Sequence, residues 1–335
     1  MNGCALPVAM ILAAGRGERM RPLSDVLPKP ALPLPCGPVV ASALQLAAAA
    51  GVGSVTVNLW HLAEEMERAL RRLEPPGIAV ATSREEKLMG TAGGLALARS
   101  RGLLGRDGPV LVINGDCLLS LELGPLLERG AAGDDLVTLA LMPHPDPVRW
   151  SRVVLTGEGT VAAMLRPGEP APGEIPFLYP GVMVVSRQAL DALPVEALAT
   201  PEALWEPARA AGRLGGAVVR GRWREVGTPR DYLEAALDPL GARSAVDPTA
   251  SVDPAATVRS TFVGDRARVA AGAVVEESVL ACGAAVGAGA RVVRSVVLGP
   301  VAIAEGEVVV DQFRVAPLLE LPRPLRSRHG PRPKA

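Results

Sequence analysis

The chain has 335 residues, of which 49% are hydrophobic and only 3% aromatic, so it can bury a large core built from Ala, Val and Leu. Lysine plus arginine and aspartate plus glutamate both number 35, and this zero net charge argues against a general nucleic-acid-binding surface. We find no apolar run long enough to span a membrane, and the length favours two domains.

Short apolar runs alternate with helical patterns over the first 240 residues. This alternation predicts an α/β fold with a Rossmann-like, mostly parallel sheet and helices on both faces. Proline and glycine enrichment at 142–180 predicts a lid or substrate-binding subregion with short strands such as 152–155 and 160–164. We expect Thr91 to be the N-cap of a helix. The expected strands are 8–14, 55–59, 78–81, 110–113, 136–141, 182–185, 217–220 and 223–226, and the expected helices are 39–50, 64–73, 91–99 and one from 228.

A loop rich in small residues and cations follows the first expected strand. Gly15 and Gly17 let backbone N–H groups approach an anion closely. Arg19 comes next, and Lys29 stands between two prolines that stiffen the backbone. Fixed cations beside such a loop suit a polyphosphate better than a neutral ligand.

Two common phosphate-binding motifs do not fit this loop. A dinucleotide fingerprint needs a third glycine where Met20 stands, and a P-loop needs a Gly-Lys pair, which the sequence lacks. Further along, Asp116 ends the strand that carries Asn114-Gly-Asp116, so its carboxylate is expected at the carboxyl edge of a parallel sheet. That position suits a magnesium ligand, because Mg²⁺ prefers one or two carboxylates plus phosphate oxygens.

The stretch 12–30 as a whole resembles the signature of the sugar-nucleotide pyrophosphorylases, which join an NTP to a sugar 1-phosphate. Met89-Gly-Thr-Ala-Gly-Gly94 is similar to the loop that cradles base and ribose in mannose-1-phosphate guanylyltransferases. The resemblance implies that Arg19 and Lys29 are catalytic cations on the phosphates. It also implies a nucleotide-binding set of Leu12, Ala13, Ala14, Gly15, Gly17, Glu86, Gly90, Thr91, Ala92 and Gly93, with Glu85 as the alternative to Glu86 for accepting from base N–H groups.

The same resemblance implies Mg²⁺ as cofactor, with Asp116 and Glu225 as metal ligands. Glu225 lies in Trp223-Arg-Glu-Val-Gly-Thr-Pro229, where the family usually has Asp. The extra methylene shifts the carboxylate by more than a tight Mg²⁺ shell tolerates without backbone adjustment.

Two segments that are expected to bind the sugar phosphate bear on the identity of the substrate. Leu165-Arg166-Pro167 stands where the family often has Glu-Lys-Pro, so Arg166 is expected to replace a lysine on the sugar phosphate. Gly181, after Phe177-Leu-Tyr-Pro, is expected to line the sugar pocket, as also in muramic acid phosphate uridylyltransferases. The resemblance favours GTP with mannose 1-phosphate. Uridylyl transfer to a hexose or amino-sugar 1-phosphate (glucose or N-acetylmuramate type) and a catalytically weak regulatory homologue stay open.

From residue 245 the periodicity changes. Apolar residues recur every six positions, with occasional fives, which is the hexapeptide repeat of a left-handed parallel β-helix. The repeat predicts three to four coils with an open end that needs covering by the tail or by another subunit, hence a possible homo-oligomer. All three histidines lie outside 245–311, which argues against an acyltransferase site in the coil.

The sequence therefore predicts a nucleotidyltransferase domain at 1–242, a left-handed β-helix at 243–311 and a basic, proline-rich tail at 312–335. The tail is either a solvated end, a cap on the coil or a subunit contact. Four cysteines without metal-ligand spacing are typical of reduced thiols and predict a cytoplasmic protein. The expected partners are an NTP and a sugar 1-phosphate, without nucleic acid or membrane.

Overall fold

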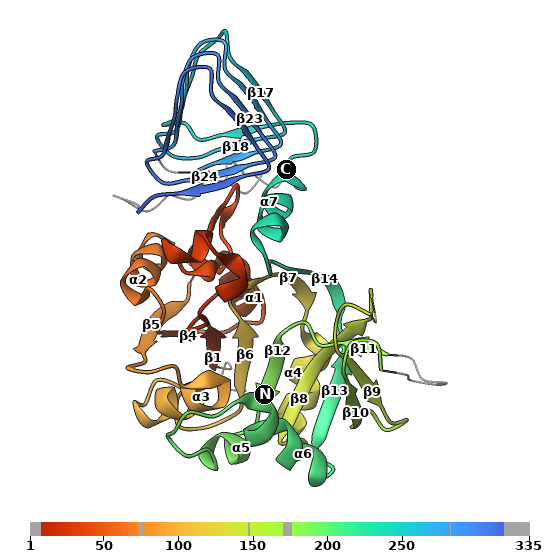
Figure 1. Ribbon diagram of the computed structural model, residues 1–335. Helices are drawn as coiled ribbons and strands as arrows, with labels where there is room; N and C mark the ends of the chain where they lie inside the picture. Colours follow the sequence, from red (N-terminus) through yellow and green to blue (C-terminus); the bar gives the residue numbers. More distant parts are fainter. Residues whose placement is uncertain (1–7, 74–76, 147, 170–175, 282, 318–335) are drawn as a thin grey trace, which may run out of the picture. The chain divides into compact units, whose positions relative to one another are not determined.

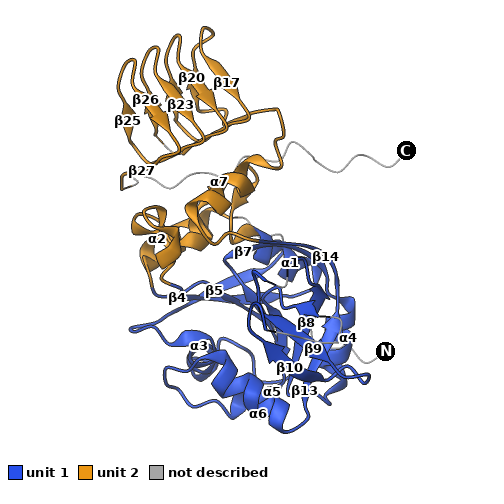
Figure 2. Ribbon diagram, turned by 45° about the vertical axis from the view of Figure 1, so that its right-hand side comes forward, with its two compact units in different colours: residues 1–15, 42–60, 75–224 blue, residues 16–41, 61–74, 225–335 orange. Residues whose placement is uncertain are grey.

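The computed structural model describes residues 8–73, 77–146, 148–169, 176–281 and 283–317. Cys4, Cys282 and most of the predicted tail lie outside them. The chain divides into two compact units (Figure 2): unit 1 comprises residues 1–15, 42–60 and 75–224, and unit 2 comprises residues 16–41, 61–74 and 225–335. Each unit therefore combines separate segments of the chain, and the division falls inside the glycine and cation stretch, between Gly15 and Arg16.

Unit 1 is built on a mixed sheet with the strand order β10-β9-β11-β8-β12-β6-β1-β4-β5, in which β13 pairs with β8 (Figure 1). The neighbouring strands β6, β1, β4 and β5 are parallel, as a βαβ pattern requires. β12 runs antiparallel to β6 and β8 and joins the two halves of the sheet. The bounds are β1 (Val8–Leu12), β4 (Ser54–Leu59), β5 (Ala79–Arg84), β6 (Val110–Asn114), β8 (Val137–Pro143), β12 (Val182–Val185) and β13 (Leu214–Val218).

The proline- and glycine-rich subregion adds an antiparallel extension to this sheet. Its strands are β9 (Arg152–Leu155), β10 (Val161–Leu165) and β11 (Phe177–Leu178), close to the predicted short strands. The predicted strand 223–226 belongs to β14 (Arg220–Glu225), which pairs with β7 (Cys117–Glu122) in a separate two-stranded sheet.

Helices pack on both faces of the unit 1 sheet, which confirms the predicted α/β class. On one face, Leu95 of α3 shares a fully buried cluster with Met10 and Val112. On the other face, α4 packs so closely on β12 that a Cβ at Gly130 would lie 2.6 Å from Val184 Cγ1. The bounds are α1 (Ala41–Ala49), α3 (Gly90–Ser100), α4 (Gly124–Ala132), α5 (Arg187–Asp191), the π-helical turn η4 (Pro201–Trp205) and α6 (Glu206–Ala210).

The prediction that Thr91 is an N-cap is wrong. α3 begins one residue earlier, and its cap residue Met89 makes no side-chain capping bond. Gly90, at φ 70°, turns the chain into the helix, and the carbonyl of Leu198 accepts a hydrogen bond from the Gly93 N–H at 3.3 Å. The Leu198 carbonyl thus takes the place of the Thr91 side chain, which was expected to accept a hydrogen bond from an N–H near the start of the helix.

Unit 2 contains short turns and two helices beside the coil. The helix α7 begins as predicted: the Thr228 side chain accepts a hydrogen bond from the Asp231 N–H, and Pro229 takes the first position. Tyr232 of α7 is fully buried, and its hydroxyl donates to the carbonyl of Pro33. The bounds are η1 (Glu18–Met20), η2 (Leu23–Asp25), η3 (Lys29–Ala31), β2 (Pro33–Leu34), β3 (Gly37–Pro38), α2 (Ala63–Arg72) and α7 (Pro229–Leu237).

The repeat forms three parallel sheets of five, four and four strands, as in a left-handed β-helix, and this confirms the predicted fold. Four coils are complete. The strands are β15 (Ala245–Val246), β16 (Ser251–Val252), β17 (Thr257–Arg259), β18 (Phe262–Val263), β19 (Arg268–Val269), β20 (Val274–Glu276), β21 (Val279–Leu280), β22 (Ala285–Val286), β23 (Arg291–Val293), β24 (Val296–Leu298), β25 (Ala302–Ile303), β26 (Val308–Val310) and β27 (Phe313–Val315).

Each coil takes 17 residues, since Ala245 aligns with Phe262 and Ser251 with Arg268. Two sides advance by six residues and the third by five, which explains the fives in the repeat. The five-residue step turns at the corner residues Ser260, Glu277, Arg294 and Asp311, all with φ between 45° and 53°. These four residues occupy the same corner in successive coils, and we call them together the short corner.

The β-helix continues past residue 311, where the sequence pattern predicted its end. β27 pairs with β24, and the Gln312 N–H donates to the Ser295 hydroxyl at 3.0 Å. The same bond runs from Ser295 N–H to Ser278 one coil earlier. The polar ladder therefore extends the coil where the apolar period is lost.

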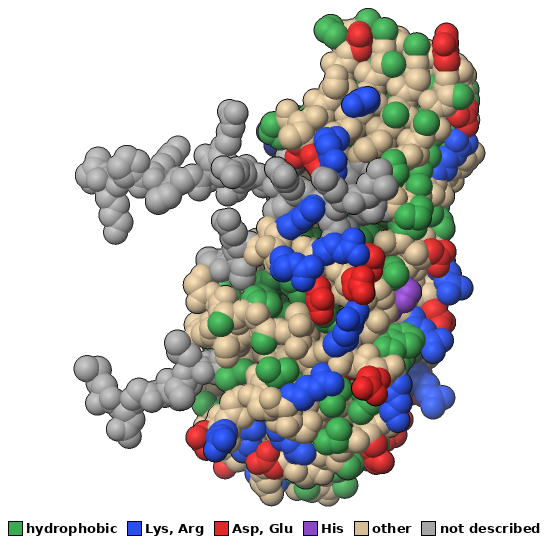
Figure 3. All heavy atoms as spheres, turned by 90° about the vertical axis from the view of Figure 1, so that its left-hand side faces the viewer, with side chains coloured by type: hydrophobic (Ala, Val, Ile, Leu, Met, Phe, Trp, Pro, Cys, Tyr) green, Lys and Arg blue, Asp and Glu red, His purple; other side chains and the backbone are tan. Residues whose placement is uncertain are grey.

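No helix in the described part of the chain is long and apolar enough to cross a bilayer. Side chains of both charges are interspersed on the face shown in Figure 3.

Candidate functional site

The carboxyl ends of β1, β4 and β6 meet at one edge of the unit 1 sheet, because these neighbouring strands are parallel. Leu12 ends β1, and its carbonyl accepts a hydrogen bond from the Gly115 N–H at 2.9 Å. Ala13 and Ala14, which follow, are buried, whereas Gly15 is exposed and a Cβ there would meet nothing within 4 Å. The edge thus presents open backbone at Gly15 on a rigid support.

A chain of hydrogen bonds connects this edge with the start of α3. The Ala13 N–H donates to Asn58 Oδ1 at 2.8 Å, and Asn58 Nδ2 donates to Glu85 Oε1 at 2.8 Å. The second carboxylate oxygen of Glu85 accepts from the Met89 N–H at 2.9 Å. Burial raises the pKa of Glu85, while these two hydrogen bonds and the Arg101 charge act to lower it. The two predicted nucleotide-binding segments are therefore tied together inside unit 1.

Sequence reasoning missed Asn58, and it left Glu85 and Glu86 as alternative acceptors beside the nucleotide. Glu85 is 4% exposed, whereas the side chain of Glu86 is at the surface. The available signal was Asn58 itself, a polar residue near the end of a β-branched run, since a buried amide needs partners.

Gly90 and Gly93 are required by packing within the protein. A Cβ on Gly90 would lie 2.5 Å from the Leu198 carbonyl oxygen, and one on Gly93 would lie 2.2 Å from that of Glu196. The close approach that was expected to serve the nucleotide is made here to residues 196–198. Ala92 is fully buried, and Thr91 is half-buried in the first turn of α3.

Asp116 and Gly181 both lie near the end of β6, where the Asn114 N–H donates to the Gly181 carbonyl at 2.8 Å. Asp116 is half-buried in the turn between β6 and β7, and Cys117 Sγ is 3.6 Å from its Oδ1. Gly181 has φ 88°, and a Cβ there would lie 2.6 Å from Asn114 Nδ2. Arg166, in contrast, is exposed after β10, where its N–H donates to Glu169 Oε2 at 2.9 Å.

Unit 2 holds the cationic half of the stretch. Gly17 has φ 63°, and a Cβ there would lie 3.2 Å from Ser24 Cβ and 3.6 Å from Lys29 Cβ. The Ser24 hydroxyl donates to the Gly17 carbonyl at 2.8 Å, and Lys29 is only 8% exposed. Gly17 and Lys29 are therefore close neighbours, and a residue with a Cβ at position 17 would crowd Ser24 and strain the backbone at this positive φ.

Arg19 and Glu225 form an ion pair within unit 2. Arg19 Nη2 lies 3.1 Å from Glu225 Oε1, and the side chains are 71% and 19% exposed. A predicted catalytic cation and a predicted metal ligand are thus in direct contact.

The donor groups fit a Mg²⁺ ion only in part. Among the residues that the structure describes, no group of three or more His, Cys, Asp or Glu side chains is placed to hold a metal. Asp116 supplies one carboxylate in unit 1, and Glu225 supplies one in unit 2 that is already paired with Arg19. Mg²⁺ commonly takes one or two carboxylates and completes its shell with phosphates and water. Each unit taken by itself therefore supplies one predicted carboxylate ligand, and the rest of a Mg²⁺ shell would have to come from phosphates and water.

Comparisons with known proteins give a family match and several relatives. Residues 8–240 match the model of the family described as nucleotidyl transferase. A mannose-1-phosphate guanylyltransferase of Mycobacterium tuberculosis is 30% identical over 233 residues, which are 69% of this chain and 64% of the relative. Mannose-1-phosphate guanylyltransferase 1 of Arabidopsis thaliana is 28% identical over 247 residues, 70% of this chain and 66% of the relative. The chain thus spans slightly less than two thirds of each of these relatives.

Proposed function

The chain belongs to the nucleotidyl transferase family, and on that premise we propose that it joins a nucleoside triphosphate to a sugar 1-phosphate. An oxygen of the sugar phosphate would form a bond to the α-phosphorus, and the bond from that phosphorus to the oxygen bridging to the β-phosphate would break. Pyrophosphate would leave with the electron pair. Both reactants are polyanions, so catalysis requires fixed cations and alignment more than a covalent nucleophile.

The observation that carries the proposal is the hydrogen-bonded chain from Ala13 through Asn58 and Glu85 to Met89. It ties the phosphate-side loop to the loop that resembles a base-binding loop. Two loops that must hold different ends of one nucleotide benefit from a fixed mutual position, because alignment of reactants lowers the barrier.

In the proposed reaction, Lys29 stabilises charge at the α-phosphate and Arg19 binds the departing phosphates. The packing of Lys29 against Gly17 supports this role for Lys29, since its stem is held in place before substrate binds.

Asp116 and Glu225 would hold Mg²⁺, and the metal would neutralise charge on the phosphates. For this Glu225 must exchange Arg19 for the metal. Glu225→Gln should therefore raise the Mg²⁺ concentration needed for half-maximal rate by about tenfold, as expected when one carboxylate ligand is lost. An unchanged Mg²⁺ requirement would remove Glu225 from the metal site.

We propose GTP and mannose 1-phosphate as the substrates, because the relatives above carry that name. Leu165 and Arg166 leave uridylyl transfer to a hexose or amino-sugar 1-phosphate as an alternative. A panel of four NTPs against several sugar 1-phosphates, with pyrophosphate release as readout, separates the two.

A second candidate is a sugar-nucleotide sensor without turnover, favoured by the Arg19–Glu225 ion pair, which occupies two predicted catalytic groups. No pyrophosphate from any pair, together with measurable nucleotide binding in calorimetry, would establish the sensor and reject the transferase.

Oligomerisation through the β-helix and a cytoplasmic location also stay proposals. Light scattering on the full chain tests the first. Val308 is 62% exposed on β26, so Val308→Arg should lower the mass if that face forms the contact.

A further inference from the structure

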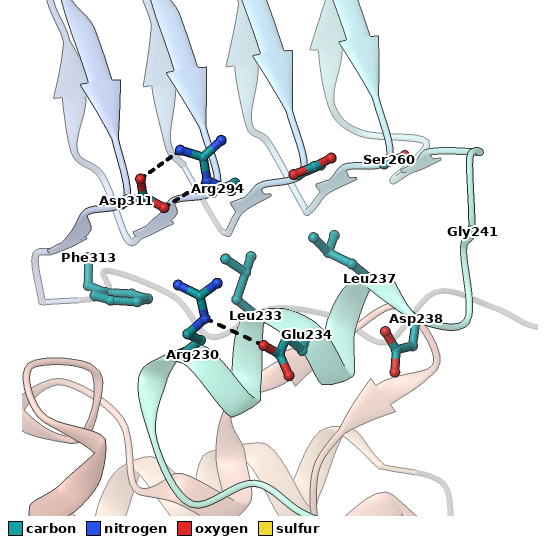
Figure 4. Close-up of a pocket in the computed structure, with 11 residues that line it drawn as sticks. Arg230, Leu233, Glu234, Leu237, Asp238, Gly241, Ser260, Arg294, Asp311 and Phe313 are labelled. Carbon is teal, nitrogen blue, oxygen red and sulfur yellow. Dashed lines mark hydrogen bonds and ion pairs between the residues drawn. The ribbon is translucent and has the colours of Figure 1, made fainter.

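A groove in unit 2 runs between α7 and the short corner (Figure 4). It has a volume of about 430 Å³, in the range of ordinary binding sites. Figure 4 shows Leu233 and Leu237 pointing from α7 toward the coil, with Phe313 of β27 at one end. The floor is thus apolar. We call it the α7 groove.

The rim of the α7 groove is acidic. Glu234, Asp238, Glu277 and Asp311 line it against two arginines, so negative charge is in excess by two. Both arginines are engaged at the rim: Arg294 binds Asp311 through two hydrogen bonds of 2.7 and 2.8 Å, and Arg230 lies 3.5 Å from Glu234. An occupant with apolar side chains and positive charge would match both floor and rim.

We propose that the α7 groove is the docking site of the chain's own segment 318–335, which lies outside the described residues. This segment follows Pro317 directly, only five positions after Phe313 of the groove floor. A few residues at about 3.3 Å each suffice to reach the groove.

The apolar residues of the segment come first and its basic residues follow, and these two parts match the floor and the rim of the α7 groove. Its first residues, Leu318, Leu319 and Leu321, are apolar and suit the floor of Leu233, Leu237 and Phe313. The basic residues that follow suit the acidic rim; they are Arg323, Arg326, Arg328, Arg332 and Lys334, against a single acidic residue, Glu320. Because the segment is tethered, its effective concentration is in the millimolar range, so weak contacts suffice.

Disulfide cross-linking of the full chain tests this proposal. In the variant Leu237→Cys with Leu319→Cys, the linked pair should form within one chain about tenfold faster than in Ser251→Cys with Leu319→Cys. Ser251 is exposed on β16 of the same β-helix and lines a different pocket, so it is the matched control. Mass spectrometry of the linked peptides separates these pairs from the natural cysteines. Equal rates for the two variants would overturn the proposal, and so would links found only between two chains, which would point to a second copy as occupant.

Charge reversal in the segment gives a second readout that changes no charged residue of the groove itself. Arg323→Glu, Arg326→Glu and Arg328→Glu together should slow the Leu237→Cys to Leu319→Cys link at least fivefold at low salt, and less at high salt. The control reverses three exposed arginines of unit 1, Arg106, Arg209 and Arg220, and should leave the rate unchanged. Equal effects of the two reversals would mean that rim charge does not hold the segment.

Discussion

Glu85 accepts hydrogen bonds from two donors at once, Asn58 Nδ2 at 2.8 Å and the Met89 N–H at 2.9 Å. Both donors are buried with Glu85, so each donor needs an acceptor oxygen of its own there. A carboxylate supplies two such oxygens, whereas an amide supplies one. The relationship makes Glu85 a positioning residue for the proposed nucleotide site, acting through Asn58 and α3.

Glu85→Gln should raise the KM for the nucleotide about tenfold, because one buried donor loses its acceptor at a cost of about 1–2 kcal/mol. The KM for the sugar phosphate should change little, and this difference between the two substrates separates a positioning role from a general loss of structure.

The double variant Asn58→Asp with Glu85→Gln offers a matched rescue of that hydrogen-bonded chain. The carboxylate introduced at position 58 would accept from the Ala13 N–H and from the amide introduced at position 85, and the oxygen of that amide would accept from the Met89 N–H. The nucleotide KM of the double variant should return to within about threefold of the original. If the double variant is as impaired as the single one, the hydrogen-bonded chain does not position the nucleotide.

The pH dependence of stability should reveal the same buried carboxylate. Burial raises the pKa of Glu85 above 4.5, so between that value and the raised pKa the folded chain binds more protons than the unfolded chain. The contribution of Glu85 to the free energy of unfolding is therefore full at low pH and is lost as pH rises through the raised pKa. The Tm of the unaltered chain minus that of Glu85→Gln should fall over this interval and then level off. A difference that grows with pH would contradict the raised pKa.

Arg152 should be replaceable with a gain in stability. It is 6% exposed, and within the described part of the chain its Nε and Nη2 find no hydrogen-bond acceptor. Arg152→Met removes buried, unpaired donors and should stabilise by about 1–3 kcal/mol, or raise the Tm by a few degrees. Arg129→Met is the matched control and should lower the Tm, because it strips the buried Asp135 of an ion pair at 2.7 Å. Calorimetry of both variants measures these two opposite changes in Tm. A lower Tm for Arg152→Met would show that the guanidinium is paired.

Lys29→Ala should lower turnover by well over tenfold while the fold is kept. The side chain is 8% exposed and packs beside Gly17, so circular dichroism and the Tm should be measured together with the rate. Near-normal turnover would mean that Lys29 only supports the loop.

Local patterns predicted much of the fold. The six-residue repeat predicted the β-helix, because each side of a coil places an apolar residue at an equivalent inward-facing position. Thr228, Pro229 and Asp231 marked the start of α7, because capping depends on neighbours in the chain. The antiparallel course of β12 and the pairing of β14 with β7 were not predicted, because strand order depends on contacts between distant segments.

The candidate site was predicted less completely than the fold. Glu85 and Glu86 are adjacent and chemically equal, and only their surroundings distinguish the buried residue from the exposed one. The glycines at 90 and 93 pack on residues 196–198, a partner about a hundred residues away in sequence. The ion pair between Arg19 and Glu225 likewise joins positions that no local pattern connects.

The strand β27 contacts η2, which lies in the signature stretch between Arg19 and Lys29. β27 is also the final strand of the sheet β15-β18-β21-β24-β27. Adding or deleting one 17-residue coil would displace this strand by about 4.8 Å, the spacing of neighbouring strands, and would take it away from η2. The contact between β27 and η2 therefore depends on the number of coils that precede β27.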